Sequence, residues 1–450
     1  MHLTVAAAGG DHATVRDAVA AAEPGARIVV RAGRYVGDLR IDKDIALVGD
    51  GGRDAVVVQG SVTITSECEL AGLTIAEPTG HGLIVRGARA NPRVRDVRVR
   101  DGAQIGLYVS AGARGRYERC EFSGSGWSNV EIRDAASDPA LCHCRIVDGK
   151  RGGVYVHSSA RARLEDCDVG ANALANVFVQ SDADPTLVRC RLHDGKEGGI
   201  MALDGGRGTL EECEIFGNAL SGVELREGAT TTLVRCIVRN GRGHGLYCHD
   251  SARGELWECA LFDNGRSGAL MQSMATPNLV GCVIRHNRDS GVIFERGGAG
   301  TLLDCTIAEH AKAGIEVRDD GEPRVERCHV EGAGAAGIEC DDGGRGRFED
   351  CVIVRAGAAG VAVGKNGAPV LVRTSVEAAL VGISVGDGGR VEADECRVRG
   401  GAVAGVSVRR SGTIKMMRSH ISGGRFGIYS DQPGGQTVEQ CEVTIEPVAA

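Results

Sequence analysis

The sequence predicts an all-β solenoid, a single-stranded parallel β-helix with about 23 residues per coil. A short unit of glycine and alternating apolar residues recurs at a fixed interval, as at Gly222, Gly245 and Gly268. Cysteines keep the same interval of 23 residues, as at Cys213, Cys236 and Cys259. Between the apolar stretches, Gly and Asn mark tight bends. A constant period in the twenties is typical of a solenoid, in which each repeat stacks on the one before it.

The cysteine row defines the coils one by one. Its members are Cys120, Cys144, Cys167, Cys190, Cys213, Cys236, Cys259, Cys282, Cys305, Cys328, Cys351, Cys396 and Cys441. Thr374 and Ser419 fill the two gaps, and Leu73 and Val97 extend the row towards the N-terminus. Apolar residues alternate with polar ones on either side, so the strands are short and the cysteines point inward. The spacing predicts about fifteen coils or more.

The chemistry of the cysteines predicts a reduced core. There are 17 of them, an odd number, and most lie in one inward row. Stacked, parallel side chains are poorly oriented for disulfides. Buried free thiols favour a cytoplasmic location. No C-x-x-C pair occurs, so we expect no metal bound by the cysteines, and no motif predicts a cofactor.

Residues 1–60 are predicted to form an N-terminal cap, and residues 61–450 the coils. An amphipathic helix is expected over 14–23, beginning at Thr14 and ending before Pro24, with Val15, Val19 and Ala22 on one face. Such a helix covers the exposed first coil, and strands then lead into the solenoid. No comparable cap follows the last coil, so we expect a further domain or another subunit to cover that end.

Composition excludes several classes of partner. The net charge is −8, so nothing favours nucleic acid. No run of about 18 apolar residues predicts a transmembrane helix, and no basic-then-apolar leader opens the chain. Aromatic residues make up only 3% of the chain, which suits a narrow core.

The stretch over residues 13–52, ATVRDAVAAAEPGARIVVRAGRYVGDLRIDKDIALVGDGG, carries a family resemblance. It resembles the opening of the pectin-lyase-like right-handed β-helix superfamily, which includes pectate lyases, pectin methylesterases, copper-loading periplasmic proteins and carbohydrate-binding CASH modules. It is also similar to actinobacterial β-helix regions, some of them fused to AAA-type ATPases. The resemblance implies right-handed coils along the whole chain, but fold alone does not imply activity.

A second period of 46 residues lies on top of the first. Prolines fall at multiples of this interval: Pro139, Pro185, Pro277, Pro323 and Pro369. The duplicated unit is therefore predicted to be two coils. Asparagines recur at one bend, at Asn172, Asn218, Asn264 and Asn287, and are expected to hydrogen bond along the axis.

Two outward rows beside the inward apolar residues form a candidate binding strip. The first row reads Tyr108, Glu131, Tyr155, Phe178, Met201, Glu224, Tyr247, Leu270, Ile293, Glu316 and Glu339. The second reads Ser110, Arg133, His157, Gln180, Leu203, Arg226, His249, Gln272, Glu295, Arg318 and Asp341. Aromatic and apolar side chains flanked by Arg, His and Glu suit a ligand-binding groove. Packing between neighbouring coils on a sheet surface is the alternative.

The candidate ligand-binding residues along the strip are Tyr108, Glu131, Arg133, Tyr155, His157, Phe178, Met201, Asp204 and Gln272. The densest polar group is Glu224, Arg226, Tyr247, His249 and Asp250. If the protein is an enzyme, these five are the catalytic candidates, with a carboxylate and a His for acid–base work and the Arg holding a substrate carboxylate. Solvated surface residues are the alternative.

Acidic residues gather further along, at Glu316, Asp319, Asp320, Glu339 and Asp341. Oxygen ligands of this kind can hold calcium, so these residues are a weak candidate site for that ion. Plain exposed acidity is the explanation that the sequence favours.

Two classes of function remain, and it stays uncertain whether the protein is an enzyme. One is a non-catalytic platform for a glycan or for a protein or peptide partner. The other is a carbohydrate-active lyase, hydrolase or epimerase. Enzymes build clefts from long loops. Here the row spacing leaves no room for such loops, and the D-P-H-[DE] run of uronate epimerases is missing. The sequence therefore favours the platform.

Overall fold

The computed structural model describes residues 1–378, 380–431 and 434–445. Over these residues the chain is an all-β parallel solenoid of about 19 turns with about 23 residues per turn, as the sequence predicts. It divides into two compact units, an N-terminal unit of Met1–Leu220 and a C-terminal unit of Ser221–Ala450. Both units are built from the same coil.

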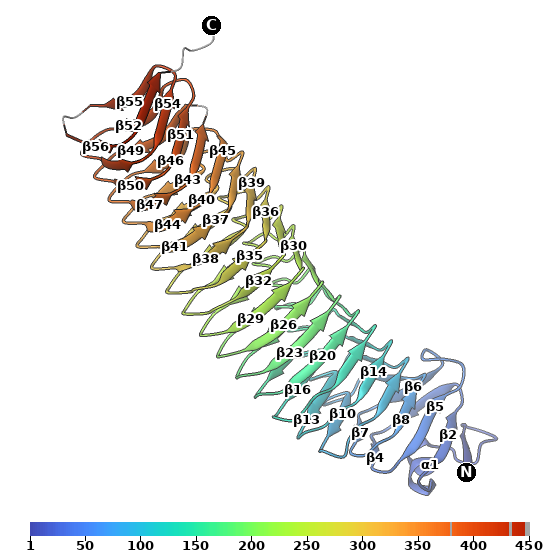
Figure 1. The fold of residues 1–450 in the computed structure, drawn as a ribbon. Helices are drawn as coiled ribbons and strands as arrows, with labels where there is room; N and C mark the ends of the chain where they lie inside the picture. The colour runs from blue at the N-terminus through green and yellow to red at the C-terminus, as the bar shows by residue number, and fades with distance from the viewer. Residues whose placement is uncertain (379, 432–433, 446–450) are drawn as a thin grey trace. The chain divides into compact units, whose positions relative to one another are not determined.

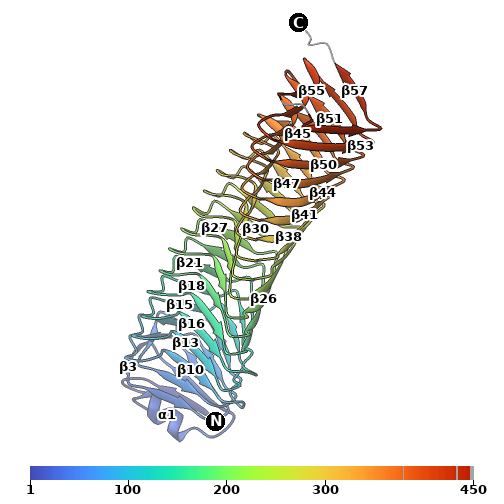
Figure 2. The same ribbon diagram turned by 90° about the vertical axis from the view of Figure 1, so that its left-hand side faces the viewer.

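Each coil contains three short strands, one in each of three parallel sheets that we call A, B and C. In the N-terminal unit one coil consists of β19 (Val154–His157) in sheet C, β20 (Arg161–Glu165) in sheet A and β21 (Asp168–Gly170) in sheet B. The next coil repeats it with β22 (Val177–Val179), β23 (Asp184–Val188) and β24 (Arg191–His193). Figure 2 shows the sheet B strands following one another in this unit, from β15 (Glu121–Ser123) through β18 (Arg145–Val147) to β21.

The C-terminal unit has the same plan. One of its coils consists of β40 (Ile315–Val317), β41 (Glu322–Glu326) and β42 (His329–Glu331). Sheet A then continues through β44 (Arg345–Glu349), β47 (Ala368–Val372) and β50 (Arg390–Asp394), which lie in one row in Figure 1. The last described strand is β57 (Glu442–Ile445). Residues 446–450, part of the end that we expect a partner to cover, lie outside the described residues.

Strand register explains the period of the sequence. Val154 pairs with Val177, Leu164 with Leu187 and Val169 with Leu192, each pair 23 residues apart in adjacent coils. Identical or similar apolar residues therefore stack along the axis, about 4.8 Å apart. All of these side chains are buried, so the core is a continuous column of Val, Leu and Ile.

The cysteine row lies inside this column, as predicted. Every cysteine is free, and all are buried except the half-buried Cys441. The thiols take part in backbone hydrogen bonding, as at Cys305, whose Sγ lies 3.4 Å from the carbonyl oxygens of both Leu279 and Leu303. Thr374 makes the same kind of contact, from its hydroxyl to the carbonyl of Phe348 at 3.2 Å. Each member of the row thus satisfies its polar atom within the core.

The buried asparagines form ladders along the axis, which confirms the predicted hydrogen bonding. In the C-terminal unit Asn264 Nδ2 donates to Asn287 Oδ1 at 3.1 Å. In the N-terminal unit the ladder alternates between two positions four residues apart, because Asn176 donates to Asn218 at 3.0 Å and receives a hydrogen bond from Asn172 at 2.8 Å. The sequence did not reveal this alternation.

His310 continues the asparagine ladder of the C-terminal unit. Its Nδ1 accepts the backbone N–H of Asn287 at 3.3 Å, and its Nε2 lies 3.1 Å from the carbonyl of Ile284. Only 3% of the residue is exposed, and this burial lowers the pKa of His310 to about 4. His244 is also buried, and its pKa is lowered in the same way to about 4. Both imidazoles are therefore neutral in the folded protein at physiological pH.

We predict that acid destabilises the protein from about pH 6.5 downward. The unfolded chain protonates these two histidines near pH 6.5, whereas the folded chain resists until about pH 4. Between these values the unfolded state binds more protons, and each histidine removes up to about 1.4 kcal/mol of stability per pH unit. His310→Asn should keep the ladder and flatten this fall, as measured by urea unfolding at pH 7 and pH 5. An equal loss in both proteins would contradict the assignment.

The helix α1 (Val15–Ala21) is the only helix among the described residues, and Figure 2 shows it beside the first coils. Thr14 caps it by accepting the N–H of Asp17 at 3.1 Å. Val15, Val19 and Ala22 are all buried, which confirms the predicted apolar face. The helix packs on β1 (His2–Val5), β2 (Ala26–Val30) and β4 (Leu39–Ile41). In the described part of the chain no helix is long and apolar enough to cross a membrane.

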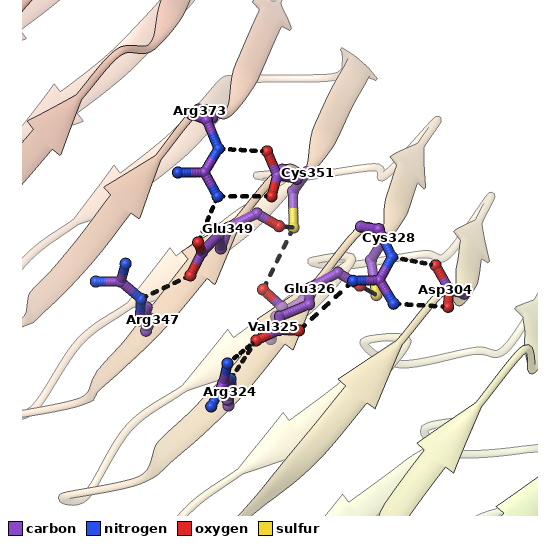
Figure 3. A network of polar contacts seen from close by, with 11 residues as sticks. Asp304, Arg324, Val325, Glu326, Cys328, Arg347, Glu349, Cys351 and Arg373 are labelled. Carbon is purple, nitrogen blue, oxygen red and sulfur yellow. Dashed lines mark hydrogen bonds and ion pairs between the residues drawn. The ribbon is translucent and has the colours of Figure 1, made fainter.

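A row of charged residues turns the corner between sheets A and B. We call it the corner ladder; in the C-terminal unit it consists of Arg235, Glu258, Gly281, Asp304, Arg327, Asp350, Arg373, Glu395 and Arg418. All of them have positive φ, for example 54° at Asp304 and 49° at Arg327. Arg327 binds both carboxylate oxygens of Asp304, at 2.8 and 3.0 Å, and Arg373 binds Asp350 in the same way. Figure 3 shows the paired contacts at the labelled Asp304 and Arg373. This alternation of sign is a second form of the 46-residue period.

Candidate ligand-binding surface

The predicted strip lies on the outer face of sheet C. In the N-terminal unit its strands are β13 (Leu107–Ser110), β16 (Val130–Arg133), β19, β22 and β25 (Ile200–Ala202). Register places the first-row residues opposite one another in sequence: Tyr108, Glu131, Tyr155, Phe178 and Met201. Arg133 pairs with His157 in the second row. The predicted neighbours are therefore neighbours in the structure.

Exposure along the strip differs from the prediction. Met201 is only 8% exposed, and in the C-terminal unit Leu270 is 8% and Ile293 3% exposed. Glu131 is buried too, while Tyr155 and Phe178 are half-buried. Coils stack about 4.8 Å apart, so large side chains in one outward row cover each other. The prediction that Met201 is available to a ligand is wrong, and the apolar part of the strip is mainly packing.

A hollow of 310 Å³ opens at the N-terminal end of the strip. It is lined by His81, Gln104, Ile105, Tyr108, Trp127, Glu131 and Arg133. The Tyr108 and His81 rings stack in parallel, 4.8 Å apart with an interplanar angle of 9°. Trp127 is 56% exposed, and the Arg151 guanidinium lies 4.9 Å from the centre of its ring. The hollow thus combines flat aromatic faces with an amide, a carboxylate and a guanidinium.

Sequence reasoning missed the side chains on one wall of this hollow. His81, Gln104 and Trp127 lie in the bends that precede strands of sheet C, outside the two predicted rows. The signal was present, because these three residues are 23 residues apart and therefore occupy equivalent places in successive coils. Trp127, one of two tryptophans in the chain, is exposed despite its large apolar ring. Exposed tryptophan in a hollow is a typical feature of binding sites.

Next to the hollow, the predicted polar residues pair with each other. The Tyr155 ring stacks on His157, 4.4 Å apart and 24° from parallel, and lies edge-on to Phe178 at 6.3 Å. His157 Nε2 lies 3.3 Å from Glu131 Oε1. Arg133 donates to Asp134 at 3.2 Å. These contacts fix the side chains before any ligand arrives, which lowers the entropic cost of binding.

The catalytic candidates of the C-terminal unit repeat this arrangement. Their strands are β28 (Val223–Leu225), β31 (Leu246–Cys248) and β34 (Ala269–Met271). Tyr247 stacks on His249, 4.3 Å apart, and Gln272 donates to the Tyr247 hydroxyl at 2.6 Å. His249 Nε2 lies 3.5 Å from Glu224 Oε1, and its Nδ1 lies 2.8 Å from Asp250 Oδ2.

These contacts decide what His249 can do. Burial favours the neutral ring, but the hydrogen bonds and charges of Glu224 and Asp250 outweigh it and raise the pKa of His249. Both ring nitrogens face carboxylates, so the ring favours the protonated state and offers no free lone pair. Burial likewise raises the pKa of Tyr247, which keeps the phenol neutral. Each ring nitrogen lies within 3.5 Å of a carboxylate oxygen, whereas a general base would need a free nitrogen.

The remaining candidates each pair with a neighbouring side chain. Arg226 lies 3.8 Å from Glu224 and 3.5 Å from Glu227. Asp204 belongs to the N-terminal unit, where it is exposed and accepts the Ser181 hydroxyl at 2.8 Å. Gln272 lies beside the catalytic candidates, since it donates to the Tyr247 hydroxyl.

The weak calcium candidate is wrong for this structure. Among the described residues no group of three or more His, Cys, Asp or Glu side chains is arranged to hold a metal ion. Glu316 is engaged by Arg318 at 2.5 Å and by the Ser290 hydroxyl at 2.7 Å. Burial, with Glu316 and Asp341 nearby, raises the pKa of Glu339. Asp319 and Asp320 are exposed in a turn, so these carboxylates do not converge.

Comparison with known proteins establishes the class. Residues 44–173, 143–270 and 251–376 match a family described as "Right handed beta helix region", so the chain belongs to that family and its coils are right-handed. This confirms the predicted right-handed parallel β-helix. No curated protein sequence matches the chain significantly.

Solved structures resemble the chain at low sequence identity. The periplasmic alginate epimerase AlgG is 15% identical, with 65% of this chain and 80% of AlgG covered and a TM-score of 0.43. The A-module of mannuronan C-5 epimerase AlgE6 from Azotobacter vinelandii is 15% identical, covering 96% and 93%, with a TM-score of 0.33. A pectin methylesterase from Aspergillus niger is 19% identical, covering 48% and 84%, with a TM-score of 0.39.

Proposed function

We propose that this protein is a non-catalytic platform that binds a carbohydrate, with the hollow around Trp127 as the main contact. The observation that carries the proposal is the exposed Trp127 ring in a hollow beside the stacked Tyr108 and His81 rings. Flat aromatic faces stack on sugar rings, and a few polar groups fix the orientation of the ligand. Gln104, Glu131 and Arg133 supply such groups in the same hollow.

The pairing of the titratable groups supports binding over catalysis. Near the hollow, Glu131 and His157 contact each other, and Arg133 contacts Asp134. In the C-terminal unit both nitrogens of His249 are engaged. A catalytic acid or base must reach the substrate with a free proton or lone pair. Paired side chains of this kind suit orientation and rigidity instead.

Tryptophan fluorescence tests the proposal directly, because the chain has only two tryptophans. In Trp257→Ala, all tryptophan emission comes from Trp127, so a bound sugar should quench or shift it. In the matched control Trp127→Ala, only Trp257 emits, and the same sugar should leave the emission unchanged. In calorimetry we expect Trp127→Ala to bind the sugar about tenfold more weakly or worse, a loss of roughly 1.4 kcal/mol in binding free energy.

The titration uses a panel of neutral and acidic oligosaccharides, with short peptides as the second series. The proposal fails if no oligosaccharide changes the emission of Trp127, or if only peptides do. Each oligosaccharide is also incubated with the wild type and analysed for products by mass spectrometry. Turnover that His249→Ala abolishes would establish the alternative, a carbohydrate-active enzyme that uses Glu224, Arg226, Tyr247 and His249.

A further inference from the structure

The C-terminal unit has an exposed apolar patch at the corner between sheets A and B. This patch is separate from the strip, which lies on sheet C. Its first row closes four sheet A strands: β29 (Thr230–Val234), β32 (Glu255–Trp257), β35 (Asn278–Val280) and β38 (Ala299–Leu303). Its second row opens three sheet B strands: β30 (Ile237–Arg239), β33 (Ala260–Phe262) and β36 (Val283–Arg285). We call the patch the apolar corner; it consists of Val234, Trp257, Val280, Leu303, Ile237, Ala260 and Val283.

Strand register makes the apolar corner continuous. Trp257 lies between Val234 and Val280 in its row, and Leu303 follows Val280. Ala260 lies between Ile237 and Val283 in the other row. Trp257 is 44% exposed, and Ile237 and Val283 are each 39% exposed. Contiguous exposed apolar side chains on a soluble surface usually mark an interaction site.

The same two rows become charged or polar in the coils that follow directly. In sheet A the row continues as Glu326 and Glu349, and in sheet B it continues as Thr306 and His329. In the N-terminal unit the equivalent residues of sheet B alternate in charge, as Arg98, Glu121, Arg145, Asp168 and Arg191. Both rows are therefore apolar together in consecutive coils here, whereas further along the unit single apolar residues such as Val352 and Val372 alternate with charged or polar ones.

We propose that the apolar corner binds a second copy of this chain around a two-fold axis. The charges of the corner ladder argue for this occupant. Between the two apolar rows the ladder reads Arg235, Glu258, Gly281 and Asp304, so a cation begins the patch and an anion ends it. Backbone hydrogen bonds stack the coils that carry these residues. The Arg235 N–H donates to the Trp257 carbonyl at 2.8 Å, and the Gly281 N–H donates to the Leu303 carbonyl at 2.9 Å.

A two-fold axis between the coils of Glu258 and Gly281 brings opposite charges together and leaves room for the facing side chains. Two copies lie antiparallel, and Arg235 of each faces Asp304 of the other. Trp257 of each copy then packs on Val280 of the other, and Val234 packs on Leu303. Gly281, where the ladder lacks a side chain, leaves room opposite Glu258. A two-fold interface of this kind needs a self-complementary patch.

Asp304 can join such an interface without leaving its own chain. Its carboxylate binds Arg327 (Figure 3), yet half of its side chain remains exposed. An ionised carboxylate accepts about four hydrogen bonds, so it can receive the Arg235 guanidinium of the second copy as well. Charge pairs at the edge of an interface set orientation and association rate more than affinity.

The size of the patch predicts a weak dimer. Its four coils span about 14 Å along the axis, from the stacking distance of the strands. A stable interface buries about 800 Å² on each partner, which is more than this patch alone supplies. We therefore expect dissociation in the micromolar range, with Trp257 as the central contact, since tryptophan dominates many interfaces.

Sedimentation equilibrium tests the proposal with the full chain. Wild type should pass from monomer to dimer between about 1 and 200 µM, a range set by the expected affinity. Trp257→Glu should weaken association at least tenfold, since it places a charge at the centre of the patch. Val283→Lys, at an independent exposed position, should act in the same direction. Trp127→Glu, the same change on the other unit, should associate like wild type, and circular dichroism checks that each variant folds.

Charge exchange tests the two-fold arrangement. Arg235→Glu and Asp304→Arg should each weaken the homodimer, because like charges then meet twice. An equimolar mixture of the two variants should dimerise like wild type, because both contacts in the mixed dimer again join a cation to an anion. A wild type that stays monomeric, or Trp257→Glu and Val283→Lys that both dimerise normally, overturns the proposal. A mixture that stays monomeric while wild type dimerises overturns the two-fold pairing. These readouts do not depend on carbohydrate binding.

Discussion

Native protein should react with a thiol reagent at Cys441 alone, and denatured protein at all 17 cysteines. Every other cysteine is buried in the core or beneath a strand, out of reach of the reagent. Burial also raises the pKa of the Cys351 and Cys396 thiols to about 11, which leaves little of the reactive thiolate at neutral pH. Counting the groups titrated before and after adding denaturant measures both numbers. Fast labelling of many thiols in the native state would contradict a closed core.

Substitution within the row should give the largest loss of stability. Cys305→Arg places an unpaired charge among buried thiols and apolar side chains, so we expect a loss of about 5 kcal/mol or more, enough to prevent folding of that region. Cys305→Thr is the matched control, because Thr374 already occupies the equivalent place and bonds the Phe348 carbonyl. It should cost about 1 kcal/mol. Thermal unfolding compares the two, and a stable Cys305→Arg protein would refute the inward orientation of the row.

The fold could be predicted because the same few residue types occupy the same positions in every coil. The period of Gly245 and Cys259 alone fixes the stacking, and register then brings Val154 onto Val177. The helix near the N-terminus follows from a Thr cap and an apolar face. Repetition makes each residue type informative many times over, since errors at one coil are corrected by its neighbours.

The candidate site could be predicted only in part. Alternation tells which side chains point outward, so Tyr108, Glu131 and Tyr155 were placed correctly in one row. It does not tell how far neighbours cover them, which is why Met201 was expected at the surface and is buried. Exposure depends on contacts between coils, and single-strand patterns do not contain these.

Bends were harder to interpret than strands. Trp127 and His81 lie where the chain turns before sheet C, and Trp257 lies where it leaves sheet A. The alternation of strands says nothing about the direction of a side chain at a turn. Their regular spacing would have shown that they align along the axis. Only the structure shows that one group lines a hollow and the other forms an apolar patch.

Gly268→Val should destabilise the C-terminal unit severely, by about 3 kcal/mol or more. At Gly268 the chain passes so close to the next coil that an added Cβ would lie 2.2 Å from the Cγ2 atom of Ile284 and 2.8 Å from the carbonyl oxygen of Gly291. Neither atom can withdraw easily, because Ile284 fills the core and the Gly291 carbonyl accepts the N–H of Ala269 at 3.1 Å.

Gly80→Ala is the matched control for Gly268→Val, since a Cβ there meets nothing within 4 Å, and it should leave the thermal midpoint almost unchanged. Coils of a solenoid are stabilised mainly by their neighbours, so the damage should be local. Hydrogen exchange of Gly268→Val should show lost protection centred on the coils of Gly245, Gly268 and Gly291, with the amides of Met1–Leu220 protected as in wild type. A normal midpoint for Gly268→Val would mean that the coils can separate at this row. The glycine period would then reflect the bend alone and not the close approach of neighbouring backbones.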